Sequence, residues 1–95
     1  MSNVFAVNYD LRVKAKPDYE GLWKELKKSP NWWHYLESTW LVQTHETAHD
    51  LWLRILPHIH DRDRVLIIEV RNNSDGWLPK EAWDWINQNL PVLAA

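Results

Sequence analysis

Side chains that could bind a metal or a phosphate gather at three places in this 95-residue sequence. The first place is Asp10, a carboxylate at the end of an alternating apolar stretch, followed by the bases Arg12, Lys14 and Lys16. Residues 11–28 hold six bases and three acids, a local charge of +3, whereas the whole chain carries −2. Such a basic strip could contact phosphate, and the alternative is a solvated helix face.

The second place is residues 45–49, which have the His-Glu-x-x-His spacing of a zinc site. The chemistry needs His45 and His49 on one face of a helix, with Glu46 as the general base. However, His45 falls at the expected junction of a strand and a helix. The next histidines, His58 and His60, follow the helix and would lie roughly 16 Å from its start.

The third place is a polar loop that holds imidazole and carboxylate side chains: His58, His60, Asp61 and Asp63. In the fold that the sequence predicts, this loop shares one end of the sheet with Asp10, and residues 45–49 lie toward the opposite end. Oxygen and imidazole ligands at that end could hold a metal and a phosphate. The alternative is an ordinary polar loop in which Asp63 caps the turn.

Hydrophobic periodicity predicts the elements that position these residues. Residues 3–11 alternate, with Phe5, Val7 and Tyr9 on one face, which is typical of a strand. The other expected elements are a helix opened by Pro17 and Asp18, strands at about 33–37 and 39–44, a helix over 46–56, a strand over 64–71 and a short last helix ended by Pro91.

This order, β-α-β-β-α-β followed by a helix, predicts one ferredoxin-like α+β domain over residues 1–95. The first and third strands are expected to be central, with the first two helices on one face of the sheet. The other face is predicted to carry Val4, Ala6, Val65 and Ile67, a set too apolar for open water. We therefore expect a homodimer in which two sheets pack face to face through these residues.

The composition narrows the class of protein. The chain has no cysteine, which excludes disulfides and thiolate metal sites, and its first ten residues lack the pattern of a signal peptide. No apolar run approaches the length of a membrane span, so a cytoplasmic protein is expected. Most of the eight tryptophans are expected to supply core or interface area. Trp77 is expected to be buried and to anchor the last helix, with Pro79 in its first turn.

Several short motifs resemble CRISPR-associated protein two, the small ferredoxin-like subunit that scaffolds spacer integration. They are Tyr9-Asp10 after the first strand, Leu-Glu-Ser-Thr-Trp at 36–40, and Asp63-Arg64-Val65 before the last strand. The CRISPR family implies a homodimer in which the acid that matches Asp10 has been proposed to hold a divalent metal for phosphodiester cleavage. Some members act only as scaffolds. Here a terminal helix stands where many members exchange an extra strand across the dimer.

Over nearly its whole length the chain also resembles short bacterial and phage proteins catalogued as SinR family. Those proteins carry a similar Tyr-Asp-Leu start, a Trp-Trp-His-Tyr-Leu-Glu-Ser-Thr-Trp stretch and a Gly-Trp-Leu-Pro-Lys tail. All three features are present in this sequence, at 9–11, 32–40 and 76–80. This second resemblance implies no settled activity.

From these observations we predict a homodimeric relative of CRISPR-associated protein two that engages nucleic acid. Arg12, Lys14 and Lys16 are the expected contacts to nucleic acid, and Asp10 is the expected ligand of Mg or Mn if the protein is a metal-dependent endonuclease for RNA or DNA. The alternative is a non-enzymatic interaction protein, such as an antitoxin, a regulator or a phage inhibitor of a defence system. A zinc metallohydrolase that uses residues 45–49 ranks third, and zinc is not expected to bind.

Overall fold

The computed structural model describes residues 2–12 and 19–92, so the predicted nucleic-acid contacts Lys14 and Lys16 lie outside the described residues. In order, the elements are β1 (Asn3–Asp10), α1 (Glu20–Lys27), β2 (Asn31–Leu36), β3 (Thr39–Thr44), α2 (Ala48–Ile55), the 3₁₀ turn η2 (Leu56–His58), β4 (Arg64–Glu69) and α3 (Lys80–Asn89). The predicted order of strands and helices is confirmed, with boundaries that differ by a few residues. In the described ranges, no helix combines the length and the apolar character that crossing a membrane requires.

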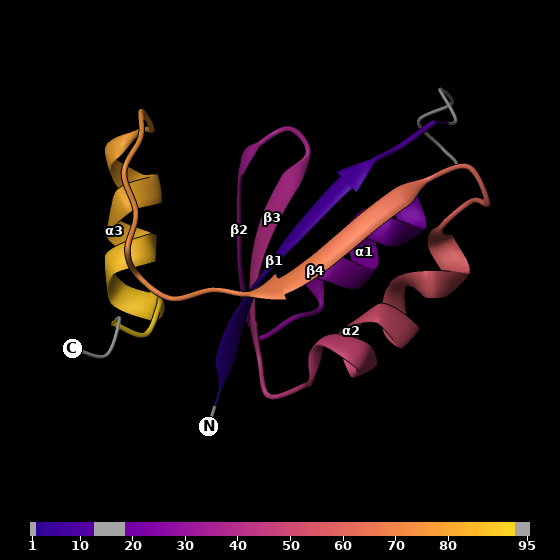
Figure 1. The fold of residues 1–95 in the computed structure, drawn as a ribbon, viewed down its shortest axis with the longest axis horizontal. Coiled ribbons are helices and arrows are strands. Elements are labelled where there is room, and N and C mark those ends of the chain that lie inside the picture. Colours follow the sequence, from indigo (N-terminus) through magenta and orange to yellow (C-terminus); the bar gives the residue numbers. More distant parts are fainter. Residues whose placement is uncertain (1, 13–18, 93–95) are drawn as a thin grey trace.

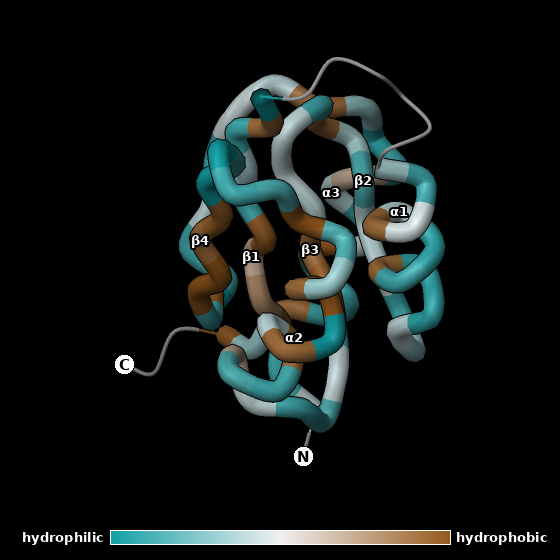
Figure 2. Tube along the Cα trace, turned by 90° about the vertical axis from the view of Figure 1, so that its right-hand side faces the viewer, coloured by the Kyte–Doolittle hydropathy of each residue, from teal (hydrophilic) through white to brown (hydrophobic). Residues whose placement is uncertain are grey.

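The four strands form one antiparallel sheet in the order β2-β3-β1-β4 (Figure 1). The first and third strands are central, as predicted. Helices α1 and α2 pack on one face of the sheet, and α3 packs on the other (Figures 1 and 2). This small α+β architecture is compatible with the predicted ferredoxin-like fold.

The core between the sheet and the first two helices is built from alternate residues of the central strands. Phe5 and Val7 of β1 point to this face, as their spacing predicts. Buried residues from the other elements complete the core: Tyr19, Leu22, Leu26, Trp40, Val42, Leu51 and Ile55. Burial of each large apolar side chain contributes about 1.5–3 kcal/mol, so this cluster is the main source of stability.

The outer face of the sheet, opposite α1 and α2, is covered in part by α3. The buried residues there are Val4, Ala6, Trp33 and Leu41 from the sheet and Ala82, Ile86 and Leu90 from α3 and its end. Hydrogen bonds fasten the helix to β2. Trp33 Nε1 donates to the Ala82 carbonyl at 3.2 Å, and Trp85 Nε1 donates to Asn31 Oδ1 at 2.9 Å. The C-terminal helix is therefore an integral layer of the fold.

The prediction that places Val65 and Ile67 on the outer face is wrong. The register pairs Val7 with Ile67 and Tyr9 with Val65, and paired residues share a face of the sheet. Both β4 residues therefore point toward the helices, where they pack against the core that Val7 belongs to. A charged side chain substituted at position 67 would therefore disturb that core. Such a variant could not be used to test for a dimer surface on the outer face.

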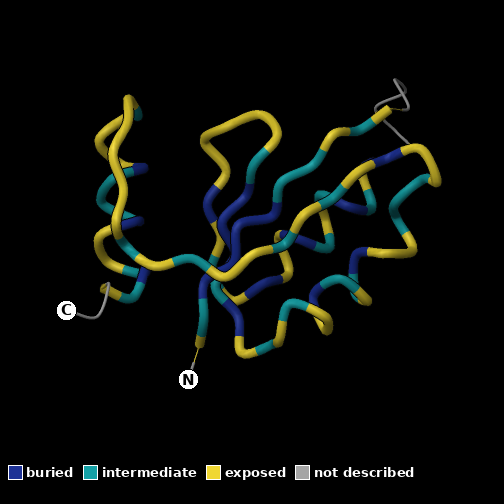
Figure 3. The backbone as a smooth tube through the Cα atoms, in the orientation of Figure 1, coloured by how far each residue is buried: buried dark blue, intermediate teal, exposed yellow. Residues whose placement is uncertain are grey.

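The other two residues of the predicted dimer surface, Val4 and Ala6, are not available to a partner either. Val4 and Ala6 do lie on the outer face, but α3 covers them. Leu66 and Ile68 of β4 stay open on this face, with exposed fractions of 59% and 52%, and β4 is drawn largely as exposed chain in Figure 3. The outer face is thus half closed by the chain itself and half open along β4.

Most tryptophans contribute to a core, as predicted, whereas Trp32 is 38% exposed and Trp77 is exposed almost completely. Trp33 and Trp40 are buried, and the ring of His34 stacks on Trp40 with a centroid distance of 4.1 Å. Trp77 is 99% exposed, in the segment that leads from β4 to α3. The expectation that Trp77 anchors the last helix is therefore wrong. Its neighbour Leu78 is the residue that packs against the outer core.

Candidate functional site

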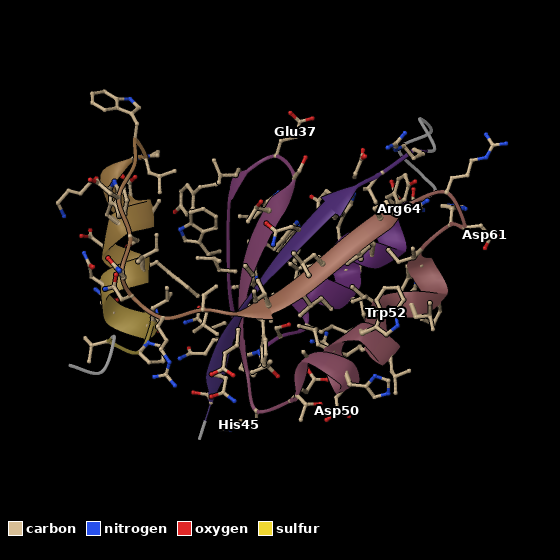
Figure 4. The ribbon with its side chains drawn as sticks, in the orientation of Figure 1. Glu37, His45, Asp50, Trp52, Asp61 and Arg64 are labelled. Atoms are coloured by element: carbon tan, nitrogen blue, oxygen red, sulfur yellow. The ribbon has the colours of Figure 1, made fainter. Side chains whose placement is uncertain are left out.

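Strand β1 ends and strand β4 begins at the same end of the sheet, and charged side chains gather there. Asp10 and Arg64 are partners in the register of the two strands. Figure 4 shows Asp61 and Arg64 at this end, and His45 at the opposite end of the sheet. The prediction that Asp10 and the loop before β4 share one end of the sheet is confirmed.

Asp10 forms an ion pair with Arg12 on the protein surface. Oδ2 of Asp10 accepts hydrogen bonds from Nε of Arg12 at 3.0 Å and from Nη2 at 2.7 Å. The Asp10 and Arg12 side chains are 60% and 57% exposed. An ion pair with this exposure stabilises a fold by only about 0–1 kcal/mol. Either group can therefore exchange its partner for an ion or a ligand from solution.

Asp63 fastens the loop before β4 to the end of β1. Its Oδ1 accepts hydrogen bonds from the Arg12 amide and the Tyr19 hydroxyl, both at 2.8 Å, and Oδ2 accepts one from the His60 amide at 2.9 Å. Burial raises the pKa of Asp63, but these hydrogen bonds outweigh burial and hold the pKa below the ordinary aspartate value. The interpretation in which Asp63 caps the turn is confirmed.

Three arginines surround an open recess at this end of the sheet. Arg12, Arg62 and Arg64 line a recess of about 510 Å³ together with Asp61. The sequence-based prediction included Arg12 but missed the other two. Their signal was the run Asp61-Arg62-Asp63-Arg64, which looks neutral because acids and bases alternate. The fold turns Asp63 inward and satisfies it with hydrogen bonds, so the guanidinium groups dominate the surface.

In the part of the chain that the structure describes, the residues around Asp10 do not form a preassembled site for a divalent metal. Magnesium takes about six oxygen ligands and is usually held by one or two carboxylates besides water and phosphate. Within residues 2–12 and 19–92, no three side chains of the metal-binding types gather. Asp10 is paired with Arg12, and both oxygens of Asp63 are occupied by hydrogen bonds. The geometry suits an anion beside the arginines better than a cation beside Asp10.

The histidines of the loop turn away from Asp10, toward α1. The His60 ring meets the Tyr19 ring edge to face, with centroids 5.3 Å apart. The His58 ring lies over Gly21 of α1, and its Nε2 is 3.9 Å from Oε2 of Glu25. The predicted alternative metal site of His58, His60 and Asp61 is therefore not assembled.

The zinc motif lacks the helical geometry that zinc binding requires. Helix α2 begins only at Ala48, and Thr47 is its N-cap. The Thr47 hydroxyl accepts a hydrogen bond from the Asp50 amide at 3.1 Å, and Asp50 Oδ2 accepts one from the Thr47 amide at 3.3 Å. This capping box fixes the start of the helix. His45 lies before it in a bend, so His45 and His49 are not one helical turn apart.

Glu46, the expected general base of that motif, is held in a different network. Its carboxylate accepts hydrogen bonds from Arg54 Nη2 at 2.9 Å and Arg54 Nε at 3.2 Å, and another from the Thr44 hydroxyl at 2.9 Å. Arg54 also donates to the Ser29 hydroxyl at 2.9 Å. The Glu46–Arg54 pair therefore ties α2 to the strand before it and to the end of α1.

Comparison of the chain with protein-family models, with curated proteins and with solved structures finds no match in any of the three. The resemblances noted from the sequence therefore stay predictions. The side chains at the end of the sheet where β1 ends and β4 begins remain as the features that indicate a function.

Proposed function

We propose that the protein binds the phosphate backbone of nucleic acid at the end of the sheet that carries Arg12, Arg62 and Arg64. The observation that supports this proposal is the open recess that these three arginines line. A guanidinium group binds phosphate through two parallel hydrogen bonds, and phosphate contacts supply much of the affinity for nucleic acid. The resemblance to CRISPR-associated protein two, with its ferredoxin-like fold, favours the same class of ligand.

Phosphate binding requires that Arg12 exchange the carboxylate of Asp10 for a phosphate oxygen. The cost of breaking this exposed pair is small, at about 0–1 kcal/mol. Asp10 then stands close to the bound phosphate, and its negative charge opposes binding. The function proposed is therefore binding, and cleavage is not assigned to Asp10, because the described carboxylates do not form a preassembled metal site.

Fluorescence anisotropy with labelled single-stranded and duplex RNA and DNA, over a range of salt concentrations, tests the proposal. Arg62→Ala should weaken binding and lower the slope of log K against log salt by about 1, because one phosphate contact is lost. Arg71→Ala is the matched control, since Arg71 is also exposed and follows the opposite end of β4. Absence of binding by the wild type at low salt, or equal effects of both variants, would contradict the proposed site.

Asp10→Asn, measured with the same probes, separates binding from metal-dependent cleavage. Loss of the carboxylate frees Arg12 and removes a repulsion, so binding should become tighter. The assay is repeated with Mg²⁺ and with Mn²⁺. If the wild type cleaves a probe only with one of these ions, and Asp10→Asn abolishes that cleavage, Asp10 is a metal ligand after all.

A second candidate function is that of a non-enzymatic interaction protein, and the exposure of Trp77 favours it. An indole that is 99% exposed has no role in the stability of this fold. Tryptophans of this kind are frequent anchors in protein interfaces, where they fill a pocket of the partner. Failure of the wild type to bind any nucleic-acid probe would make this candidate the leading one.

A further inference from the structure

Aromatic rings from three elements meet where β2 passes beside α1. Trp23 of α1, His34 of β2 and Trp40 of β3 hold nearly parallel rings. The centroids of His34 and Trp40 are 4.1 Å apart, and Trp23 stands beside them at 6.4 Å and 6.2 Å. Trp32 of β2 tilts against Trp40 at 5.2 Å. We call these four residues the aromatic cluster.

One face of the His34 ring is open to solvent. Trp40 is buried and covers the inner face of the imidazole. Strand β2 is at the edge of the sheet, and in the described part of the chain no strand lies beyond it. Helix α3 packs on the other face of the sheet and does not reach this ring. His34 is accordingly exposed, with the outer face of its ring directed away from the core.

The His34 ring is also held in a fixed orientation. Its Nε2 lies 3.3 Å from the Glu37 carbonyl oxygen, and because a carbonyl only accepts, Nε2 is the nitrogen that carries the proton in this hydrogen bond. The same carbonyl accepts a hydrogen bond from the Tyr9 hydroxyl at 2.7 Å. The Tyr9 hydroxyl in turn accepts one from Trp40 Nε1 at 3.2 Å. A ring held in this way loses little side-chain entropy when a ligand stacks on it.

Exposed lysines of α1 border the aromatic cluster. Nζ of Lys27 lies 5.7 Å from the centroid of the Trp32 ring. Lys24 and Lys27 are both exposed, and no carboxylate of the described residues lies within ion-pairing distance of either. Glu25, the acid between them in the sequence, is paired with Arg54 of α2. The charge beside the rings is therefore positive and suits an anionic ligand.

We infer that the aromatic cluster binds an unpaired base of single-stranded nucleic acid, with the base stacked on the outer face of His34. The phosphates that flank the base would lie beside Lys24 and Lys27. This inference rests on the proposed function and narrows its ligand to single strands, because stacking on a side chain requires a base that is not enclosed in a duplex.

A base fits this surface better than the apolar side chain of a protein partner. What His34 offers is the face of a flat ring, and every base presents a matching face. The side chains that anchor protein interfaces instead fill well-packed pockets. The lysines of α1 add attraction for phosphate, which an apolar side chain does not carry.

Fluorescence anisotropy with two labelled strands of equal length tests the inference. One is an ordinary single-stranded oligonucleotide, and the other has the same phosphates but abasic sugars at its centre. The charges are equal, so a difference in affinity reports on the bases. The wild type should bind the ordinary strand at least about fivefold more tightly, the lower end of what stacking of one base contributes. Equal affinities for the two strands would overturn the inference.

Three variants locate the stacking surface. His34→Ala should weaken binding of the ordinary strand at least about fivefold and leave binding of the abasic strand unchanged. His34→Phe keeps a flat ring and should restore most of the affinity. Tyr35→Ala is the matched control, since Tyr35 is also exposed but contacts Trp33 on the other face of the sheet. Equal effects of His34→Ala and Tyr35→Ala, or an equal loss for both strands in His34→Ala, would contradict stacking at His34.

The same two strands distinguish this inference from the proposed phosphate site. The aromatic cluster and the arginine recess involve β2 and β4, which are opposite edges of the sheet. Arg62→Ala should weaken binding of both strands alike, because it removes a phosphate contact. If only Arg62→Ala has an effect, the stacking inference fails and the phosphate site stands. If only His34→Ala has an effect, the phosphate site fails and stacking stands.

Discussion

The two faces of the sheet are built from alternate residues of the same strands, yet they are closed to different degrees. The face under α1 and α2 holds a continuous core, whereas α3 closes only part of the outer face and leaves Leu66 and Ile68 open (Figure 3). The basic recess and the free edge of β4 both lie beside this open part. In this small domain, one face of the sheet is closed by a continuous core, and the other face leaves apolar and charged side chains open to solvent.

The largest expected effect comes from a truncation in the helix-face core. Leu51→Ala should lower the free energy of unfolding by about 2–5 kcal/mol, because Leu51 is fully buried between α2 and the sheet. Ile86→Ala is the matched change under α3, and its loss should be smaller, because the half-open outer face can relax around it. Urea unfolding of both variants measures the difference. Equal losses would show that the two faces are packed alike.

An intermediate loss of unfolding free energy is expected from a substitution of Asp63, whose hydrogen bonds join the loop before β4 to the end of β1 and to Tyr19. Asp63→Asn should cost about 1–3 kcal/mol at neutral pH, since an amide cannot replace the carboxylate as acceptor of three hydrogen bonds. The pKa of Asp63 is lower in the folded state than the ordinary 3.8, so its stabilising contribution is present above that pH and is lost as the pH falls through the folded pKa.

Acid titration of stability provides the measurement for this residue. Wild-type unfolding free energy should decline below the ordinary pKa of aspartate, and the decline should be shallower in Asp63→Asn. Asp61→Asn is the control, because Asp61 is exposed in the same loop. If both variants behave alike, the hydrogen bonds of Asp63 do not hold the loop in the way described.

The smallest effect is expected on the outer face, at the contact between β2 and α3. Trp33→Phe keeps an aromatic ring but removes the donor to the Ala82 carbonyl, which should cost roughly 1 kcal/mol. Amide exchange should become faster in α3 and stay unchanged in the pairing of β1 with β3. Uniformly faster exchange throughout the sheet would mean that α3 and the sheet unfold together, and would weaken the distinction between the two faces.

The order of elements and the helix-face core could be predicted because they depend on local periodicity. Phe5 and Val7 alternate clearly, and the apolar stripes of α1 and α2 have helical spacing. The prediction that Asp10 and the loop before β4 lie at the same end of the sheet followed from the order of the strands alone. Predicting these features does not require the register between paired strands.

The errors arose where the sequence has no local signal. Residues 65–68 are all apolar, so the pattern does not reveal which of them face the helices, and only the register with β1 decides it. Arg62 and Arg64 gave no basic signal in the sequence because they alternate with Asp61 and Asp63. Trp77 lies in a segment without periodicity, where its apolar character suggested burial and the fold left it exposed.

The contact between His58 and Gly21 has a consequence for how this sequence can change. A β-carbon at position 21 would lie 2.9 Å from Cε1 of His58 and closer still to its Nδ1, so even alanine requires the imidazole to move. Movement of the ring would separate His58 from Glu25 and disturb the junction of η2 with α1. Positions 21 and 58 are therefore coupled: a larger residue at position 21 is accommodated more easily beside a smaller residue at position 58, 37 positions away in the sequence.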